Sequence, residues 1–146
     1  MSNEKLIEVE KGRFVLFRAT AFSPIIYNQL FKDHDFFKDV EIFSNMATEI
    51  ETDGEAAQPT RHFTIDEYKL FTRLAYCYAY QGISKGPFRT KEQEKFLAEN
   101  ADPWAWLDTF SQFSMITILP EIVDMWQINE KALAKAKNQH PAPPEK

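Results

Sequence analysis

Cysteine, histidine and glycine are scarce in this chain of 146 residues, which contains one Cys, three His and four Gly. A single cysteine excludes an internal disulfide and fits a reducing compartment, and Cys77 lies in an apolar, aromatic segment where it is expected to fill the core. The sequence contains no glycine-rich phosphate loop, no zinc-type Cys and His spacing and no serine elbow between glycines. We therefore expect no enzyme, no cofactor and no metal.

His34 is the one histidine with acidic neighbours, because it stands between Asp33 and Asp35. Such a cluster is a candidate metal site, but adjacent residues on a short segment rarely converge on one ion. A solvated turn is the expectation for this segment.

Runs of Lys and Arg and long apolar segments are also missing. The formal net charge is -5 and the isoelectric point is near 5.2. The chain therefore lacks the overall positive potential that attracts the phosphate backbone of a nucleic acid. No window reaches the roughly 18 apolar residues of a membrane helix, and the N-terminal segment MSNEKLIEVEK has mixed charge. We expect a cytosolic protein that binds neither nucleic acid nor a membrane.

The composition predicts one globular domain with its own core, since 44% of the residues are hydrophobic and 27% are charged. The apolar spacing predicts a mainly α, compact fold of about five to six helices over residues 1–138, with a small N-terminal β-hairpin. The acidic segment 48–61 is predicted to be a solvated loop, and the tail 139–146 to be disordered.

The N-terminal hairpin is predicted from two short segments rich in Ile, Val and Phe, Lys5–Glu10 and Arg13–Thr20. Lys11-Gly12 separates them, and glycine tolerates the positive φ of a two-residue turn. A helix should start directly afterwards, because Ser23 can serve as its N-cap and Pro24 suits its first position.

Further helix starts are marked by side chains that accept hydrogen bonds from backbone N–H groups. Thr64 with Glu67, and Thr90 with Gln93, have the spacing of a capping box. The helix after Thr64 should end at Gly82, which can take the left-handed cap conformation. The other expected N-caps are Asp35, Asp102 and Ser114.

The C-terminal part shows apolar residues at spacings of three and four from Met115 to Trp126, which indicates one face of a helix. Pro120 interrupts this pattern and is compatible with two arrangements. Either one helix is kinked there, or a single turn from Ser114 is followed by a second helix that starts at Pro120.

The three tryptophans lie close together in the sequence. Trp104 and Trp106 are two residues apart, so on a helix they point about 200° away from each other, and one small domain can hardly bury both. One is therefore expected in the core and the other at a partner-binding surface, with Phe36, Phe37 and Trp126 as further members of that surface. The expected core includes Phe71, Leu74 and Tyr78.

Four segments, taken in their order and spacing, resemble the tail assembly chaperones of long-tailed, siphovirus-like bacteriophages and prophages of Gram-positive bacteria. The resemblance extends from about Arg13 to Asn138. Its segments are FVLFRAT, IIYNQLFKDHDFFKDV, FTRLAYCYAY and DPWAWLDTFSQFSMITILPEIVDMWQIN.

The resemblance implies a non-enzymatic function during assembly of the phage tail. Such chaperones bind the tape measure protein, keep this long helical chain soluble and promote polymerisation of the tail tube around it. The resemblance also implies a mostly helical fold, self-association, action in the host cytoplasm and absence from the mature virion. A longer form made by ribosomal frameshifting would recruit the tail tube protein, and this chain would be the short form.

The alternative interpretation is a small helical adaptor or regulator that binds another protein through the same aromatic residues and is unrelated to tails. The sequence also departs from the family. The segment Phe31 to Asp35 has no glycine where a Phe-Gly-basic-Asp turn is expected, and the acidic stretch around Asp53 and the segment 82–99 are longer.

Overall fold

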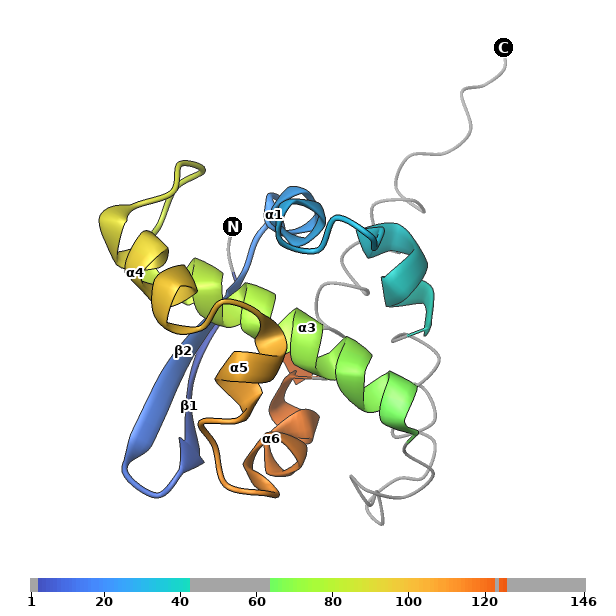
Figure 1. Ribbon diagram of the computed structural model, residues 1–146, viewed down its shortest axis with the longest axis vertical. Coiled ribbons are helices and arrows are strands. Elements are labelled where there is room, and N and C mark those ends of the chain that lie inside the picture. The colour runs from blue at the N-terminus through green and yellow to red at the C-terminus, as the bar shows by residue number, and fades with distance from the viewer. Residues whose placement is uncertain (1–2, 43–63, 123, 126–146) are drawn as a thin grey trace, which may run out of the picture.

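The computed structural model describes residues 3–42, 64–122, 124 and 125. The chain forms a mainly helical fold with an N-terminal two-stranded hairpin, as predicted (Figure 1). Three predictions lie outside the described residues: the loop 48–61, the tail 139–146 and the position of Trp126. The elements are β1 (Asn3–Glu10), β2 (Arg13–Ala19), α1 (Ser23–Leu30), a helical segment at 36–42, α3 (Ile65–Ile83), α4 (Lys91–Glu99), α5 (Pro103–Leu107), α6 (Ser114–Thr117) and a helical segment that begins at 119.

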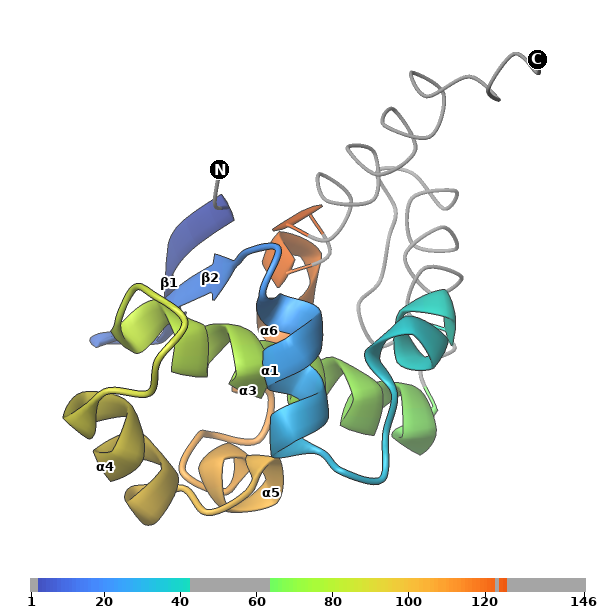
Figure 2. The ribbon, with the colours of Figure 1, turned by 90° about the horizontal axis from the view of Figure 1, so that it is seen from above.

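The longest helix in the described part of the chain, α3, runs through its centre. Figure 2 shows α4 and α5 on one side of it and the hairpin and α6 on the other, while α1 crosses it. Its residues are accordingly buried on all sides from Leu70 to Gln81, except for Arg73, which is partly exposed. The neighbouring elements therefore surround this part of α3. The predicted core residues Phe71, Leu74 and Tyr78 are all buried.

The hairpin matches its prediction. Its strands pair antiparallel, with Leu6 opposite Leu16, and the turn glycine Gly12 has a φ of 81°. Alternate residues face the core, because successive side chains of a strand point to opposite sides. The buried residues of this sheet face include Ile7, Val9, Phe17 and Ala19.

Both predicted capping boxes are present. The Glu67 N–H donates to Thr64 Oγ1 over 3.0 Å, and the Gln93 N–H donates to Thr90 Oγ1 over 3.2 Å. The two other side-chain caps that formed accept from the third helical residue: Asp35 from the Lys38 N–H, and Asp102 from the Ala105 N–H.

Removal of the first cap gives a direct test of this local structure. Thr64→Ala is expected to lower the free energy of unfolding by about 1 kcal/mol, because it leaves the Glu67 N–H without its acceptor. Thr64→Ser keeps the hydroxyl and should stay close to the wild type. Urea unfolding of the two variants measures the difference, and an equal loss in both would contradict the role of the hydroxyl.

Two predicted N-caps are wrong. Ser23 and Ser114 are the first residues of α1 and α6, not the residues before them. Their hydroxyls bind distant segments instead: Ser23 donates to the Gln81 side chain, and Ser114 donates to Glu10 Oε1 over 2.7 Å. Tertiary hydrogen bonds have thus replaced the local caps.

The predicted end of α3 is also wrong, since the helix continues through Gly82 to Ile83. The glycine is required for a different reason. A Cβ atom built at Gly82 would lie 1.8 Å from the backbone oxygen of Leu16. Gly82 therefore marks the place where α3 packs directly on the backbone of β2.

The chain around Pro120 adopts the second predicted arrangement, in which a single turn from Ser114 is followed by a second helix. The single turn α6 ends at Thr117, Ile118 leaves the helical pattern, and helical structure resumes at residue 119, one residue before the proline. The missing N–H of Pro120 thus falls in a first turn, where it costs no hydrogen bond. None of the helices in the described part of the chain is long and apolar enough to cross a membrane.

Candidate partner-binding surface

The short helix α5 places its two tryptophans in opposite environments. Asp102 caps the helix and Pro103 begins it, so Trp104 and Trp106 lie on different sides of a single turn. Trp106 is 3% exposed and its ring packs edge to face against Phe110, with centroids 5.1 Å apart. Trp104 is 41% exposed. The predicted division is confirmed, with Trp106 in the core and Trp104 at the surface.

The neighbouring pair Phe36 and Phe37 is divided in the same way. Phe36 is 7% exposed and packs against the Tyr27 ring at 5.5 Å, whereas Phe37 is 66% exposed. Phe36 therefore presents no side chain to a partner, contrary to its place in the predicted surface, and Trp106 is the tryptophan of the pair that fills the core. Of the predicted surface residues that the structure describes, Trp104 and Phe37 are the exposed ones.

Trp104 stands at the edge of a hollow of about 270 Å³. Three segments far apart in the sequence form its walls: the end of α1 with the residues that follow it, the middle of α3, and the link from α4 to α5. We call this site the Trp104 hollow. Its apolar and aromatic lining residues are Leu30, Phe31, Tyr76, Pro103 and Trp104, and its charged or titratable ones are Lys32, Asp33, His34, Arg73 and Asp102.

One wall of the Trp104 hollow is fixed by a polar network around Asp39. Its Oδ2 accepts a hydrogen bond from the Tyr27 hydroxyl over 2.5 Å, and it lies 3.2 Å from His34 Nδ1 and 3.7 Å from Arg73 Nη2. Arg73 Nε also donates to the Tyr27 oxygen. Burial, and then the hydrogen bond to Asp39, raise the pKa of Tyr27, so its hydroxyl remains a donor. The network holds residues 34–39 against α3.

Other polar groups of the Trp104 hollow have no protein partner within the described part of the chain. No hydrogen bond or ion pair there engages Lys32, Asp33 or the indole N–H of Trp104, while Asp102 uses one carboxylate oxygen to cap α5. Burial raises the pKa of Tyr76 to about 12, and the charge of Asp102 is the next cause. The hollow therefore combines an exposed indole with polar groups that remain available.

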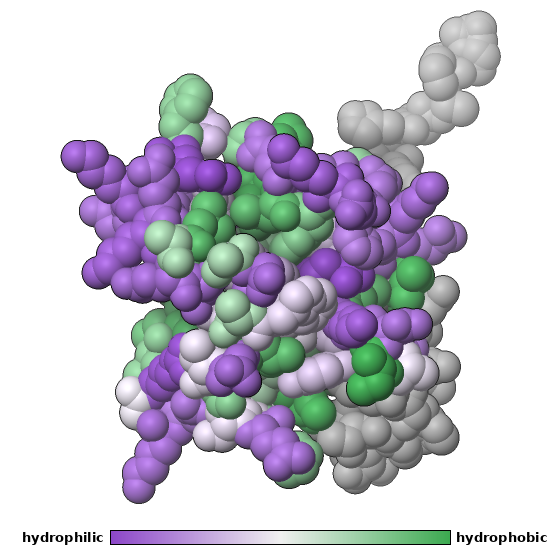
Figure 3. Space-filling model, in the orientation of Figure 1, coloured by the Kyte–Doolittle hydropathy of each residue, from purple (hydrophilic) through white to green (hydrophobic). Residues whose placement is uncertain are grey.

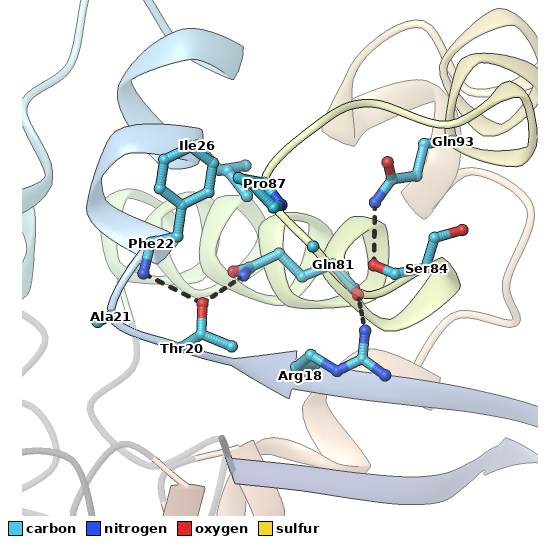
Figure 4. A pocket seen from close by; sticks show the side chains of 10 residues that line it. Arg18, Thr20, Ala21, Phe22, Ile26, Gln81, Ser84, Pro87 and Gln93 are labelled. Atoms are coloured by element: carbon cyan, nitrogen blue, oxygen red, sulfur yellow. Dashed lines mark hydrogen bonds between the residues drawn. The ribbon is translucent and has the colours of Figure 1, made fainter. Parts of the chain in front are cut away.

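A larger cavity of about 450 Å³ lies at the C-terminal end of α3, between α1 and the link from α3 to α4 (Figure 4). Its polar side chains are already engaged. Arg18 donates to the backbone oxygen of Gln81 over 2.6 Å, and Gln93 donates to the backbone oxygens of Tyr80 and Ser84. They satisfy carbonyls that the last turn of a helix leaves without partners. The polar side chains that line this cavity already bind the backbone, so they are less available to a partner. The Trp104 hollow is the better candidate site.

Among the described residues, no group of three or more His, Cys, Asp or Glu side chains converges on a site for a metal ion. Cys77 is completely buried, and burial raises the pKa of its thiol. Figure 3 shows hydrophobic residues as separate areas among hydrophilic ones on the face that carries α1, α4 and α5. Comparison with models of known protein families, with curated proteins and with solved structures found no match to this chain.

Proposed function

We propose that this protein is a phage tail assembly chaperone that binds and solubilises the tape measure protein and promotes polymerisation of the tail tube around it. It acts in the host bacterial cytoplasm, self-associates and is absent from the mature virion. A frameshifted longer form provides the contact with the tail tube protein. The proposal requires no catalytic residue, cofactor or metal.

One observation supports this function most strongly: the half-exposed indole of Trp104 at the edge of a hollow in a well-packed helical body. Tryptophan is enriched among the residues that dominate binding energy, especially beside pockets that exclude water. The resemblance of the four quoted segments to tail assembly chaperones supplies the identity of the partner.

The mechanism follows from the chemistry of the partner. A tape measure protein is a very long helical chain whose apolar stripes would aggregate if they were left exposed. A chaperone shields such a stripe by receiving its side chains in an apolar site, as in other complexes where a helix lies in a groove. Trp104 provides such a site together with the wall that the Asp39 network holds against α3.

Co-expression with a fragment of the long helical protein encoded nearby tests the proposal. The fragment should be insoluble alone, and soluble and co-eluting on a sizing column when this protein is present. Trp104→Ala should abolish co-elution, and Phe14→Ala is a matched control because Phe14 is an exposed aromatic on the hairpin, outside the Trp104 hollow.

A fragment that stays insoluble beside well-folded wild-type protein would contradict the chaperone function. A gene located between a tail tube gene and a very long coiled-coil gene would support it. A different gene neighbourhood would favour the adaptor, and an unbiased search for partners would then replace the co-expression experiment.

A further inference from the structure

We propose that the Trp104 hollow receives one large apolar side chain of a helical partner, and that basic residues beside that side chain pair with carboxylates at the rim. This inference rests on the proposed function, because it defines the chemistry of the partner segment at the same site.

The size of the hollow fits a single side chain. Its volume of about 270 Å³ lies below the roughly 300–1,000 Å³ of typical small-molecule pockets. Leu30, Phe31 and Pro103 give it an apolar wall, and the indole N–H of Trp104 is free to donate to a partner at the edge. Helices bind grooves through single anchor residues that project from one face, so a helix can fill this hollow with one of them.

Arg73, a cation that lines the hollow, is engaged inside the protein. Arg73 and His34 both face the carboxylate of Asp39, from α3 and from the segment after α1 respectively. Tyr27 faces the same carboxylate from α1 and stays neutral, because its pKa is raised. Arg73 is therefore balanced by Asp39 and leaves little positive charge for a partner.

The remaining charges at the rim give it an acidic character. Asp33 and one oxygen of Asp102 are carboxylates without protein partners, and Lys32 is the single unpaired cation that lines the hollow among the described residues. The charge of Asp102 also reaches the interior, since it adds to the rise in the pKa of Tyr76. The whole chain carries a formal net charge of -5. Complementary charge on a partner is therefore positive.

A helical partner can carry its positive charges close to the rim of the Trp104 hollow. Residues three or four positions from an anchor lie on the same face of the helix, so lysines at these positions would reach the rim while the anchor fills the hollow. Rim ion pairs are individually weak and are screened by salt. The expected preference for a basic partner is therefore about three- to tenfold in Kd at low ionic strength.

Two synthetic helical peptides provide the test with the full-length protein. Both lack tryptophan and carry one central leucine anchor; one has lysines three and four residues on either side of it, and the other has glutamates there. Fluorescence anisotropy of labelled peptides measures Kd. The wild type should bind the lysine peptide about three- to tenfold more tightly, and high salt should remove the preference.

Substitutions at the rim test whether its carboxylates cause the preference for the lysine peptide. Asp33→Asn combined with Asp102→Ser should remove it without loss of melting temperature, because serine still caps α5. Lys32→Gln should increase it, and Trp104→Ala should weaken binding of both peptides. Equal or tighter binding of the glutamate peptide, a preference that persists in the double variant, or no binding of either peptide would overturn the inference. If the wild type still solubilises the tape measure fragment, the proposed function would remain.

Discussion

Trp106→Ala is expected to lower the free energy of unfolding by about 3–5 kcal/mol, whereas Trp104→Ala should keep the melting temperature and lose partner binding. Trp106 is 3% exposed and packs edge to face against Tyr76 and Phe110, so its truncation leaves a cavity among rings that cannot collapse easily. Trp104 is 41% exposed and lines an open hollow, so its truncation leaves no enclosed cavity in the core.

Thermal unfolding and the co-expression experiment, applied to both variants, separate the two effects. Phe14→Ala serves as a control, because this ring is 58% exposed on the hairpin and does not line the Trp104 hollow. It should leave stability nearly unchanged and retain the tape measure fragment. Equal loss of stability in Trp104→Ala and Trp106→Ala would contradict the division of roles between the two tryptophans.

Features that depend on a few adjacent residues could be predicted from the sequence. The capping boxes at Thr64 and Thr90 and the Asp102 cap each satisfy a backbone N–H three residues away, so all the interacting groups are visible in one short segment. The hairpin turn at Gly12 has the same local character. The opposed tryptophans could be predicted as well, because helical periodicity alone separates them.

Features that depend on contacts between distant segments were missed. Ser23 and Ser114 had the right chemistry for N-caps, but Gln81 and Glu10 accept hydrogen bonds from their hydroxyls in the folded chain. No local pattern shows that these partners are near. The sequence predicted Phe71, Leu74 and Tyr78 as core residues, but neighbouring elements bury almost every side chain of α3 from Leu70 to Gln81.

The Trp104 hollow itself could not be predicted, because its walls come from three segments that only the fold brings together. One signal for it was nevertheless present. Arg73 is the single charged residue between Leu70 and Gln81, the buried part of α3. A lone charge in a buried helix requires a partner, and the structure provides Asp39. The sequence did not indicate which carboxylate this would be.

The second large effect is expected at Gly82, where replacement by alanine should destabilise the protein by about 1–3 kcal/mol or more. Glycine in the interior of a helix normally costs about 0.5–1 kcal/mol relative to alanine, so Gly→Ala usually stabilises. Here the added Cβ would lie 1.8 Å from the Leu16 oxygen and 2.7 Å from its carbonyl carbon. Both are backbone atoms of β2, so no side-chain rotation relieves the clash.

The substitution therefore has to separate α3 from β2, and it should also lengthen the nearby hydrogen bond from Arg18 to the Gln81 oxygen. Urea unfolding of Gly82→Ala measures the loss. Ala98→Gly is a control at an exposed position of α4, where only helix propensity acts and a loss of about 1 kcal/mol is expected. Alanine should then be the better residue at position 98 and the worse one at position 82. An increase in the stability of Gly82→Ala would show that α3 and β2 do not approach so closely.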